Sequence, residues 1–100
     1  MRKKRDSFRD YVSEQLGDGV EIRPMFGGYG LYRSERFFGI VFKSRLYFKT
    51  GPLSRKKYVD RGMKPFKPNA RMTSKTYFEV PADVLEDRDT LRGWALEAAR

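Results

Sequence analysis

Three short segments rich in strand-forming residues follow one another with only two residues between them. They span residues 29–33, 36–42 and 45–49, and the connections are Ser34-Glu35 and Lys43-Ser44. Two-residue connections join neighbouring antiparallel strands, so the chain is predicted to contain a three-stranded antiparallel meander. Neither connection contains Asn-Gly, and the sequence therefore leaves the register of these strands open.

Helices are expected at both ends of the chain and once in the middle. Over residues 6–16 apolar side chains recur at helical spacing, and Gly17 can end that helix in the left-handed conformation. Residues 53–61 are predicted to form a short helix that stops at Gly62. The last helix is expected to pack on the sheet or on the first helix through one apolar face, formed by Leu91, Trp94, Ala95 and Ala98.

A further strand is predicted over residues 72–80, where the pattern alternates again before Pro81. This alternation places on one face Met72, Thr76, Phe78 and Val80. At 100 residues the chain can bury one hydrophobic core but not two. The sequence thus predicts a single α+β domain over residues 1–100, with an antiparallel sheet of about four to five strands packed with N- and C-terminal helices.

Cysteine and histidine are both absent from the chain. Without cysteine the chain has no disulfides, no thiolate zinc sites and no cysteine nucleophile. Without histidine it lacks the side chain that most often serves as a general base near neutral pH. We therefore expect no catalytic residues, no metal and no cofactor. No apolar run approaches the roughly 20 residues of a membrane span, and the basic N-terminus is not followed by an apolar signal-peptide core. The protein is expected to be cytoplasmic and without a membrane partner.

Two groups of residues imitate catalytic sites. Ser54-Arg55-Lys56-Lys57 matches the S-x-x-K motif of penicillin-binding enzymes, and Lys49-Thr50-Gly51 matches their K-T-G motif, but here the second precedes the first. We interpret both as accidental. Four acids could be imagined as a catalytic pair or a magnesium site, and we interpret them instead as charges near helix starts: Asp83, Glu86, Asp87 and Asp89.

Positive charge gathers in the middle of the chain. The net charge is +9, and residues 43–75 hold eleven bases but only one acid, Asp60. The candidate nucleic-acid-binding residues are Arg55, Lys56, Lys57, Arg61, Lys64, Lys67, Arg71 and Lys75. Tyr58, Phe66 and Tyr77 are interleaved with them, which suits phosphate contact combined with base stacking. The alternative is a solvated basic face with ordinary core aromatics.

The stretch from residue 23 to residue 30 is unusual because three of its last four residues are glycines. It could cradle an anion, but it lacks the spacing of both the dinucleotide fingerprint and the phosphate loop. We favour a structural turn or bulge that enters the sheet, with Met25 and Phe26 turned into the core. The residues with this expected structural role are Arg23, Met25, Phe26, Gly27, Gly28, Tyr29 and Gly30.

Several motifs in order along the chain together resemble the TfoX (Sxy) N-terminal domain family. They are Arg23-Pro24-Met25-Phe26-Gly27-Gly28-Tyr29-Gly30-Leu31-Tyr32, Leu46-Tyr47-Phe48-Lys49, Gly62-Met63-Lys64-Pro65-Phe66, Tyr77-Phe78-Glu79-Val80-Pro81 with Val84-Leu85-Glu86-Asp87, and Leu91 with Trp94-Ala95. The resemblance implies a compact bacterial α+β domain whose named relatives regulate natural competence through another transcription regulator. It implies no catalytic residues. Those relatives carry a second, C-terminal domain. This chain ends where that domain would begin, so we expect a stand-alone domain here.

One departure from the family pattern concerns charge. Family members tend to have acids before the Leu-Tyr-x-Lys strand, whereas this chain has Lys43-Ser44-Arg45, so the positive face is expected to be particular to this protein. The first hypothesis is a non-enzymatic regulatory module that binds a protein partner in transcription regulation, nucleic acid, or both. The alternatives are a small-ligand or anion binder or enzyme that uses the Gly27 to Gly30 loop with Arg23, and a structural homodimer joined by sheet edges.

Overall fold

The computed structural model describes the backbone of residues 4–25 and 27–100, and the side chains from Ser7 onward apart from residue 26. Five antiparallel strands form one sheet in the order β1-β2-β3-β4-β5. The elements in chain order are α1 (Lys4–Leu16), β1 (Glu21–Met25), β2 (Gly28–Arg33), β3 (Arg36–Phe42), β4 (Arg45–Lys49), α2 (Arg55–Asp60), β5 (Tyr77–Glu79), α3 (Ala82–Glu86) and α4 (Arg88–Ala98). The predicted α+β class, with an antiparallel sheet and helices at both ends, is confirmed.

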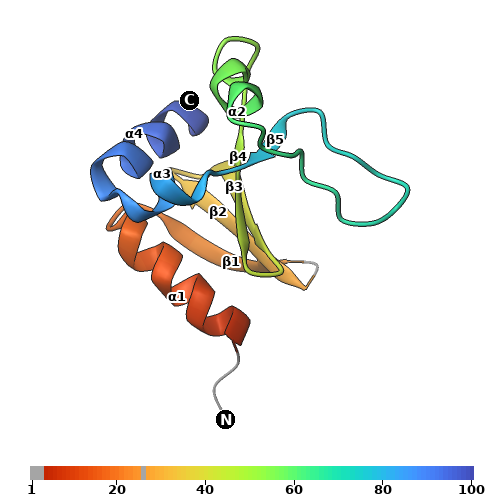
Figure 1. Cartoon of the computed structure of the whole chain (residues 1–100). Helices are drawn as coiled ribbons and strands as arrows, with labels where there is room; N and C mark the ends of the chain where they lie inside the picture. Colours follow the sequence, from red (N-terminus) through yellow and green to blue (C-terminus); the bar gives the residue numbers. More distant parts are fainter. Residues whose placement is uncertain (1–3, 26) are drawn as a thin grey trace.

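The helices α1, α3 and α4 contact one another and lie on one side of the sheet, and the long loop between α2 and β5 projects from the other side (Figure 1). The C-terminal helix α4 contacts α1, α3, β3 and β4. Leu91, Ala95 and Ala98 are buried there, and Trp94 is half-buried against the same core. The prediction that the last helix packs through this stripe is confirmed, and it packs on both the sheet and the first helix.

Two tight turns set the register that the sequence leaves open. Ser34 and Glu35 have φ of 50° and 68°, and Lys43 and Ser44 have φ of 51° and 60°. Left-handed conformation at both central residues is the two-residue hairpin geometry whose twist matches that of the flanking strands. Four non-glycine residues thus adopt a conformation that L-residues visit rarely, and the pairing of the strands on either side holds them in it.

The register sorts the strand side chains into two sets, because directly paired residues share a face of the sheet. Leu31 pairs with Gly39, which pairs with Phe48, which pairs with Phe78. With the residues in phase with them, they form the covered face, beneath α1, α3 and α4: Ile22, Tyr29, Leu31, Gly39, Val41, Leu46, Phe48 and Phe78. The opposite set forms the open face: Glu21, Arg23, Met25, Gly28, Gly30, Tyr32, Phe37, Ile40, Phe42, Arg45, Tyr47, Lys49, Tyr77 and Glu79.

An irregularity in the pairing of β2 with β3 adds one more aromatic residue to the core. Leu31 pairs with Gly39 and Tyr32 pairs with Phe37, so Phe38 has no partner on β2. Phe38 is fully buried, and its ring centroid lies 5.6 Å from that of Phe48. The bulge therefore places the consecutive residues Phe38 and Gly39 on the covered side and shifts the alternation of β3, so that Phe37 faces the open side.

Three elements differ from the sequence prediction. Strand β1 was not predicted, because Pro24 interrupts the strand signal and two of its other residues, Glu21 and Arg23, are charged. The predicted strand over residues 72–80 shortens to β5, since the side chains of Asn69 and Ser74 accept hydrogen bonds from backbone amides of residues 71–77 and hold that stretch in turns. Met72 is accordingly 59% exposed rather than on a buried face. The short helix α3 was also missed.

Candidate nucleic-acid interface

Four of the eight candidate basic residues are engaged within the domain. The Arg55 guanidinium donates to the hydroxyl of Thr50 at 2.9 Å. The other three are held by carboxylates: Lys56 by Asp60, Lys57 by Glu97 and Arg61 by Asp83. Lys57 and Arg61 also lie over the Trp94 ring, at 4.7 and 5.4 Å from its centroid. The charges of Lys56, Lys57 and Arg61 are therefore paired with carboxylates, whereas Arg55 is held by a neutral hydroxyl.

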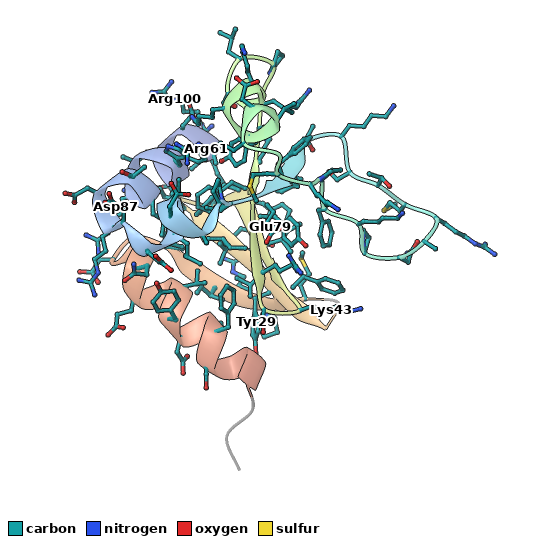
Figure 2. All side chains as sticks on the ribbon, viewed as in Figure 1. Tyr29, Lys43, Arg61, Glu79, Asp87 and Arg100 are labelled. Carbon is teal, nitrogen blue, oxygen red and sulfur yellow. The ribbon has the colours of Figure 1, made fainter. Side chains whose placement is uncertain are left out.

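The other four basic residues lie on the loop over residues 61–76 and are all exposed: Lys64, Lys67, Arg71 and Lys75. Across the described residues, none of the four has a carboxylate within ion-pair distance. The loop itself contains no acid. We call this set the loop cations. In Figure 2 the long side chains of this loop extend outward, away from the helices.

Backbone hydrogen bonds tie the first part of this loop to the sheet. The amide of Phe66 donates to the carbonyl of Tyr77 at 2.8 Å, and the amide of Glu79 donates to the carbonyl of Lys64 at 2.9 Å. Residues 64–66 thus extend the sheet beyond β5, with a bridge between Pro65 and Phe78. Of the loop cations, Lys64 is consequently held next to β5, and the other three follow it on the projecting part of the loop.

The three interleaved aromatic residues do not share one environment. Tyr58 is only 1% exposed and packs edge-on against Trp94, with ring centroids 4.9 Å apart, so it belongs to the core. Burial also raises the pKa of Tyr58 far above its ordinary value. Phe66 packs edge-on against Tyr47 on the open face, with centroids 5.0 Å apart, and Tyr77 lies on the same face.

The open face carries a line of rings that sequence reasoning missed. The ring centroids of Tyr32 and Phe37 lie 5.2 Å apart, and those of Phe37 and Tyr77 lie 5.6 Å apart. We call these three residues the aromatic row. Each is half-buried, and burial is the main cause of the raised pKa of Tyr77. Strand alternation alone could not have found this row, because the bulge in β3 shifts the alternation and so places Phe37 on the open face.

Gly30 lets the aromatic row lie close against the backbone. A Cβ atom at this position would approach Phe37 to 3.0 Å and Tyr32 to 3.2 Å. Gly28 is more constrained, since a Cβ atom there would lie 2.3 Å from the carbonyl oxygen of Val41, while Gly27 has a left-handed φ of 79°. This geometry supports the structural interpretation of the glycine-rich stretch.

The sequence predicts that Met25 and Phe26 both turn into the core, and the structure tests this prediction for Met25 only. Met25 does not enter the covered core. It is half-buried on the open face, with its sulfur near Gly30, because the alternation of β1 turns Ile22 toward the helices and Met25 away from them. Phe26 lies outside the described residues, so its predicted burial stays a prediction.

Arg23, the charge proposed for an anion-binding loop, is already engaged. Its guanidinium lies 2.8 Å from a Glu21 carboxylate oxygen and 3.7 Å from one of Glu35. It also lies 4.3 Å from the ring centroid of Tyr32. The hydrogen bond from Arg23 lowers the pKa of Glu21. An anion at this loop would have to displace two carboxylates.

The motifs that imitate catalytic sites have local structural partners. The hydroxyl of Ser54 accepts a hydrogen bond from the Gly51 amide at 2.8 Å, and the Thr50 hydroxyl donates to the carbonyl of Thr76 at 2.7 Å. Asp87 caps α4 by accepting from the Thr90 amide. Within residues 4–25 and 27–100, no three acids come together as a metal site would require, and no helix there has the length and apolar character to cross a bilayer.

Comparison with known proteins places this geometry in a family. The family model of the TfoX N-terminal domain matches residues 10–100, which is nearly the whole chain. A search of the curated proteins finds no match. Membership supports a regulatory-type domain, the class to which the sequence motifs also pointed. The chain belongs to the TfoX N-terminal domain family.

Proposed function

We propose that this domain is a non-enzymatic regulatory module that binds nucleic acid through the loop cations. The observation that carries the proposal is the division of the basic residues: four are engaged by acids, a threonine or a ring, and four are exposed, unpaired and gathered on one loop. A regulatory role alongside a protein partner in transcription is consistent with the family.

Pairing matters because a phosphate competes with whatever a cation already binds. A loop cation exchanges only counterions and water for a phosphate oxygen, and the released counterions drive binding. Lys56 and Arg61 would bring a phosphate close to the carboxylates of Asp60 and Asp83, which repel it. We therefore expect affinity to come from the loop and not from α2.

Fluorescence anisotropy with a labelled oligonucleotide tests this proposal. With duplex DNA, about four phosphate contacts give a slope near −3.6 in log affinity against log salt, so raising salt from ~50 to ~200 mM should weaken binding roughly a hundredfold. Replacing Lys64, Lys67 and Lys75 together by Gln should reduce that slope to about −0.9.

The matched control removes the same charge from α2 and the residue after it, through Lys56→Gln, Lys57→Gln and Arg61→Gln. Thermal melts verify that both triple variants are folded at the assay temperature. The control should keep most of the slope. Equal losses in the two triples would show that overall charge, not the loop, drives binding, and no detectable binding at ~50 mM salt would refute the proposal.

The two rival functions have weaker support. An anion site at Gly27 to Gly30 would use an arginine that two glutamates already hold. A homodimer joined through β1 would pair an edge strand that contains Pro24, which lacks an amide hydrogen and opposes edge-to-edge pairing.

A further inference from the structure

The proposed function leaves the aromatic row without a role. Tyr32, Phe37 and Tyr77 come from three different strands, yet their rings form a continuous line on the open face. Beside this line, Ile40 and Tyr47 are only 6% and 8% exposed, so the apolar surface exposed here belongs to the rings themselves, and Glu79 pairs in register with Tyr47 on the same face. None of the described helices packs on this side, because α1, α3 and α4 occupy the covered face and α2 meets Phe78 of that face through Tyr58.

Cations flank this apolar surface at both ends. Lys49 pairs in register with Tyr77 and therefore lies on the open face next to the row. At the other end of the strands, the Lys43 ammonium lies 5.4 Å from the centroid of the Phe42 ring. Lys75 precedes Tyr77 by two residues on the loop. Within the described part of the chain, none of these three lysines has a carboxylate at ion-pair distance.

Rings in a line with cations around them complement one kind of polyanion. A single strand of nucleic acid presents a chain of phosphates together with bases whose faces are free to stack, whereas a duplex keeps its bases paired inside. Aromatic rings on a sheet face stack such bases with little regard to sequence, and lysines track the backbone phosphates. An acidic protein segment would supply carboxylates for the lysines, but it lacks the regular repeat of one planar base for each phosphate that a single strand offers to a line of rings.

We propose that the open face binds single-stranded nucleic acid, with bases stacked on the aromatic row and phosphates held by Lys43, Lys49 and the loop cations. This inference rests on the proposed function and adds to it the strandedness of the ligand. The rings contribute an apolar contact, which salt does not screen, and the lysines contribute an ionic one, which salt weakens. The two contributions can thus be separated by experiment.

Anisotropy with a labelled twelve-nucleotide oligothymidylate, the corresponding oligouridylate and a duplex of the same length provides the test. Both single strands should bind more tightly than the duplex. Tyr77→Leu and, separately, Tyr32→Leu should each weaken single-strand binding at least about fivefold, because a stacked base is lost. The loss should be the same at ~50 and ~200 mM salt. Two separate variants keep the test valid if one of them fails to fold.

Tyr11→Leu is the matched control, because Tyr11 is an exposed tyrosine on α1, the helix layer on the other side of the sheet. Its binding should equal that of the wild type. Two results together would refute this inference and leave the proposed function standing. The duplex would bind as tightly as the single strands. Tyr77→Leu and Tyr32→Leu would bind normally, whereas the triple Gln variant of Lys64, Lys67 and Lys75 would not. If nothing binds at ~50 mM salt, both fail.

A third outcome would assign the row to another partner. Sedimentation velocity of the wild type and of Tyr77→Leu measures self-association directly. A wild-type dimer that Tyr77→Leu dissociates, together with unchanged oligonucleotide binding, would show that a second copy of this chain covers the open face, and would overturn the proposal.

Discussion

The two faces of the sheet are built from the same strands and differ in what they meet. On the covered face, Leu31 and Phe48 are fully buried beneath the helices, and Gly39 makes room for both. On the open face, the half-buried rings of Tyr32, Phe37 and Tyr77 lie against one another, and the Arg23 guanidinium lies 4.3 Å from the centroid of the Tyr32 ring. Strand alternation alone would allow a polar outer face, which is common in antiparallel sheets. Here the outer face instead carries a row of partly exposed rings, and it is the surface to which we assign the proposed binding.

Truncating one aromatic residue on each face should give the largest difference. Phe48→Ala should lower the free energy of unfolding by about 3 to 5 kcal/mol, because the residue is fully buried. Tyr77→Ala should lower it by roughly 1 to 2 kcal/mol, because its ring is only half-buried. Urea denaturation measures both values. Equal losses in the free energy of unfolding would mean that the open face is a second closed core, and would contradict the difference between the two faces.

The glycines give the next largest effect and locate the tightest backbone approach. Gly28→Ala should destabilise the domain by about 3 kcal/mol, since its Cβ atom would lie 2.3 Å from a backbone oxygen that cannot move without shifting β3. Gly93→Ala, in α4, meets no atom within 4 Å and should instead stabilise the protein by about 1 kcal/mol. Thermal melts of the two variants should therefore shift in opposite directions. A neutral Gly28→Ala would show that the hairpin is not closely packed.

Gln15 joins the helices that cover the sheet, and its replacement should have an intermediate effect. This buried side chain donates to the carbonyl of Leu85 at 2.9 Å and accepts from the Arg88 guanidinium at 3.1 Å. Gln15→Leu leaves both partners unsatisfied and should cost about 2 kcal/mol. Oligonucleotide binding by the folded variant should stay normal, because the open face is untouched. A binding defect in the folded variant would show that the two faces are coupled.

The smallest effect concerns pH and reports on the core near α2. Because burial raises the pKa of Tyr58, the folded protein holds the phenolic proton more tightly than the unfolded chain does. Below about pH 10, the ordinary pKa of tyrosine, both states are protonated. Above it the unfolded chain loses its proton first, so stability falls as the pH rises.

Tyr58→Phe should therefore melt like the wild type at pH 7 and lose less stability above pH 10. Tyr11→Phe, on the exposed surface of α1, is the control and should follow the wild type throughout. Circular dichroism melts across this pH range measure the difference. If Tyr58→Phe loses as much stability above pH 10 as the wild type does, ionisation of the buried Tyr58 hydroxyl is not what destabilises the protein at high pH.

Much of the fold could be predicted because the local signals agree with the tertiary structure. The two-residue connections, the stripe on α4 and Gly17, which adopts a left-handed φ of 78°, each correspond to an observed feature. Strand β1 could not be found in the same way, since it is held by pairing with β2 and not by its own residues. The turns at residues 69–76 depend on side-chain hydrogen bonds that an alternating pattern does not reveal.

The candidate site was only partly predictable. The excess of basic residues is visible in the sequence, but which cations are unpaired depends on acids far along the chain, such as Glu97 beside Lys57 and Asp83 beside Arg61. The aromatic row depends on the bulge in β3, which turns Phe37 toward the open face and Phe38 into the core. No local pattern contains that information.

The most direct test of the account follows the ring signals of individual aromatic residues by NMR during titration with oligothymidylate. We predict that the ring signals of Tyr32, Phe37 and Tyr77 change in chemical shift in proportion to binding. The ring signals of Tyr11 and Tyr58 should keep their chemical shifts. Shifts confined to Tyr11 or to the helix layer, or shifts of lysine signals with no change in the aromatic row, would contradict the claim that the open face stacks bases.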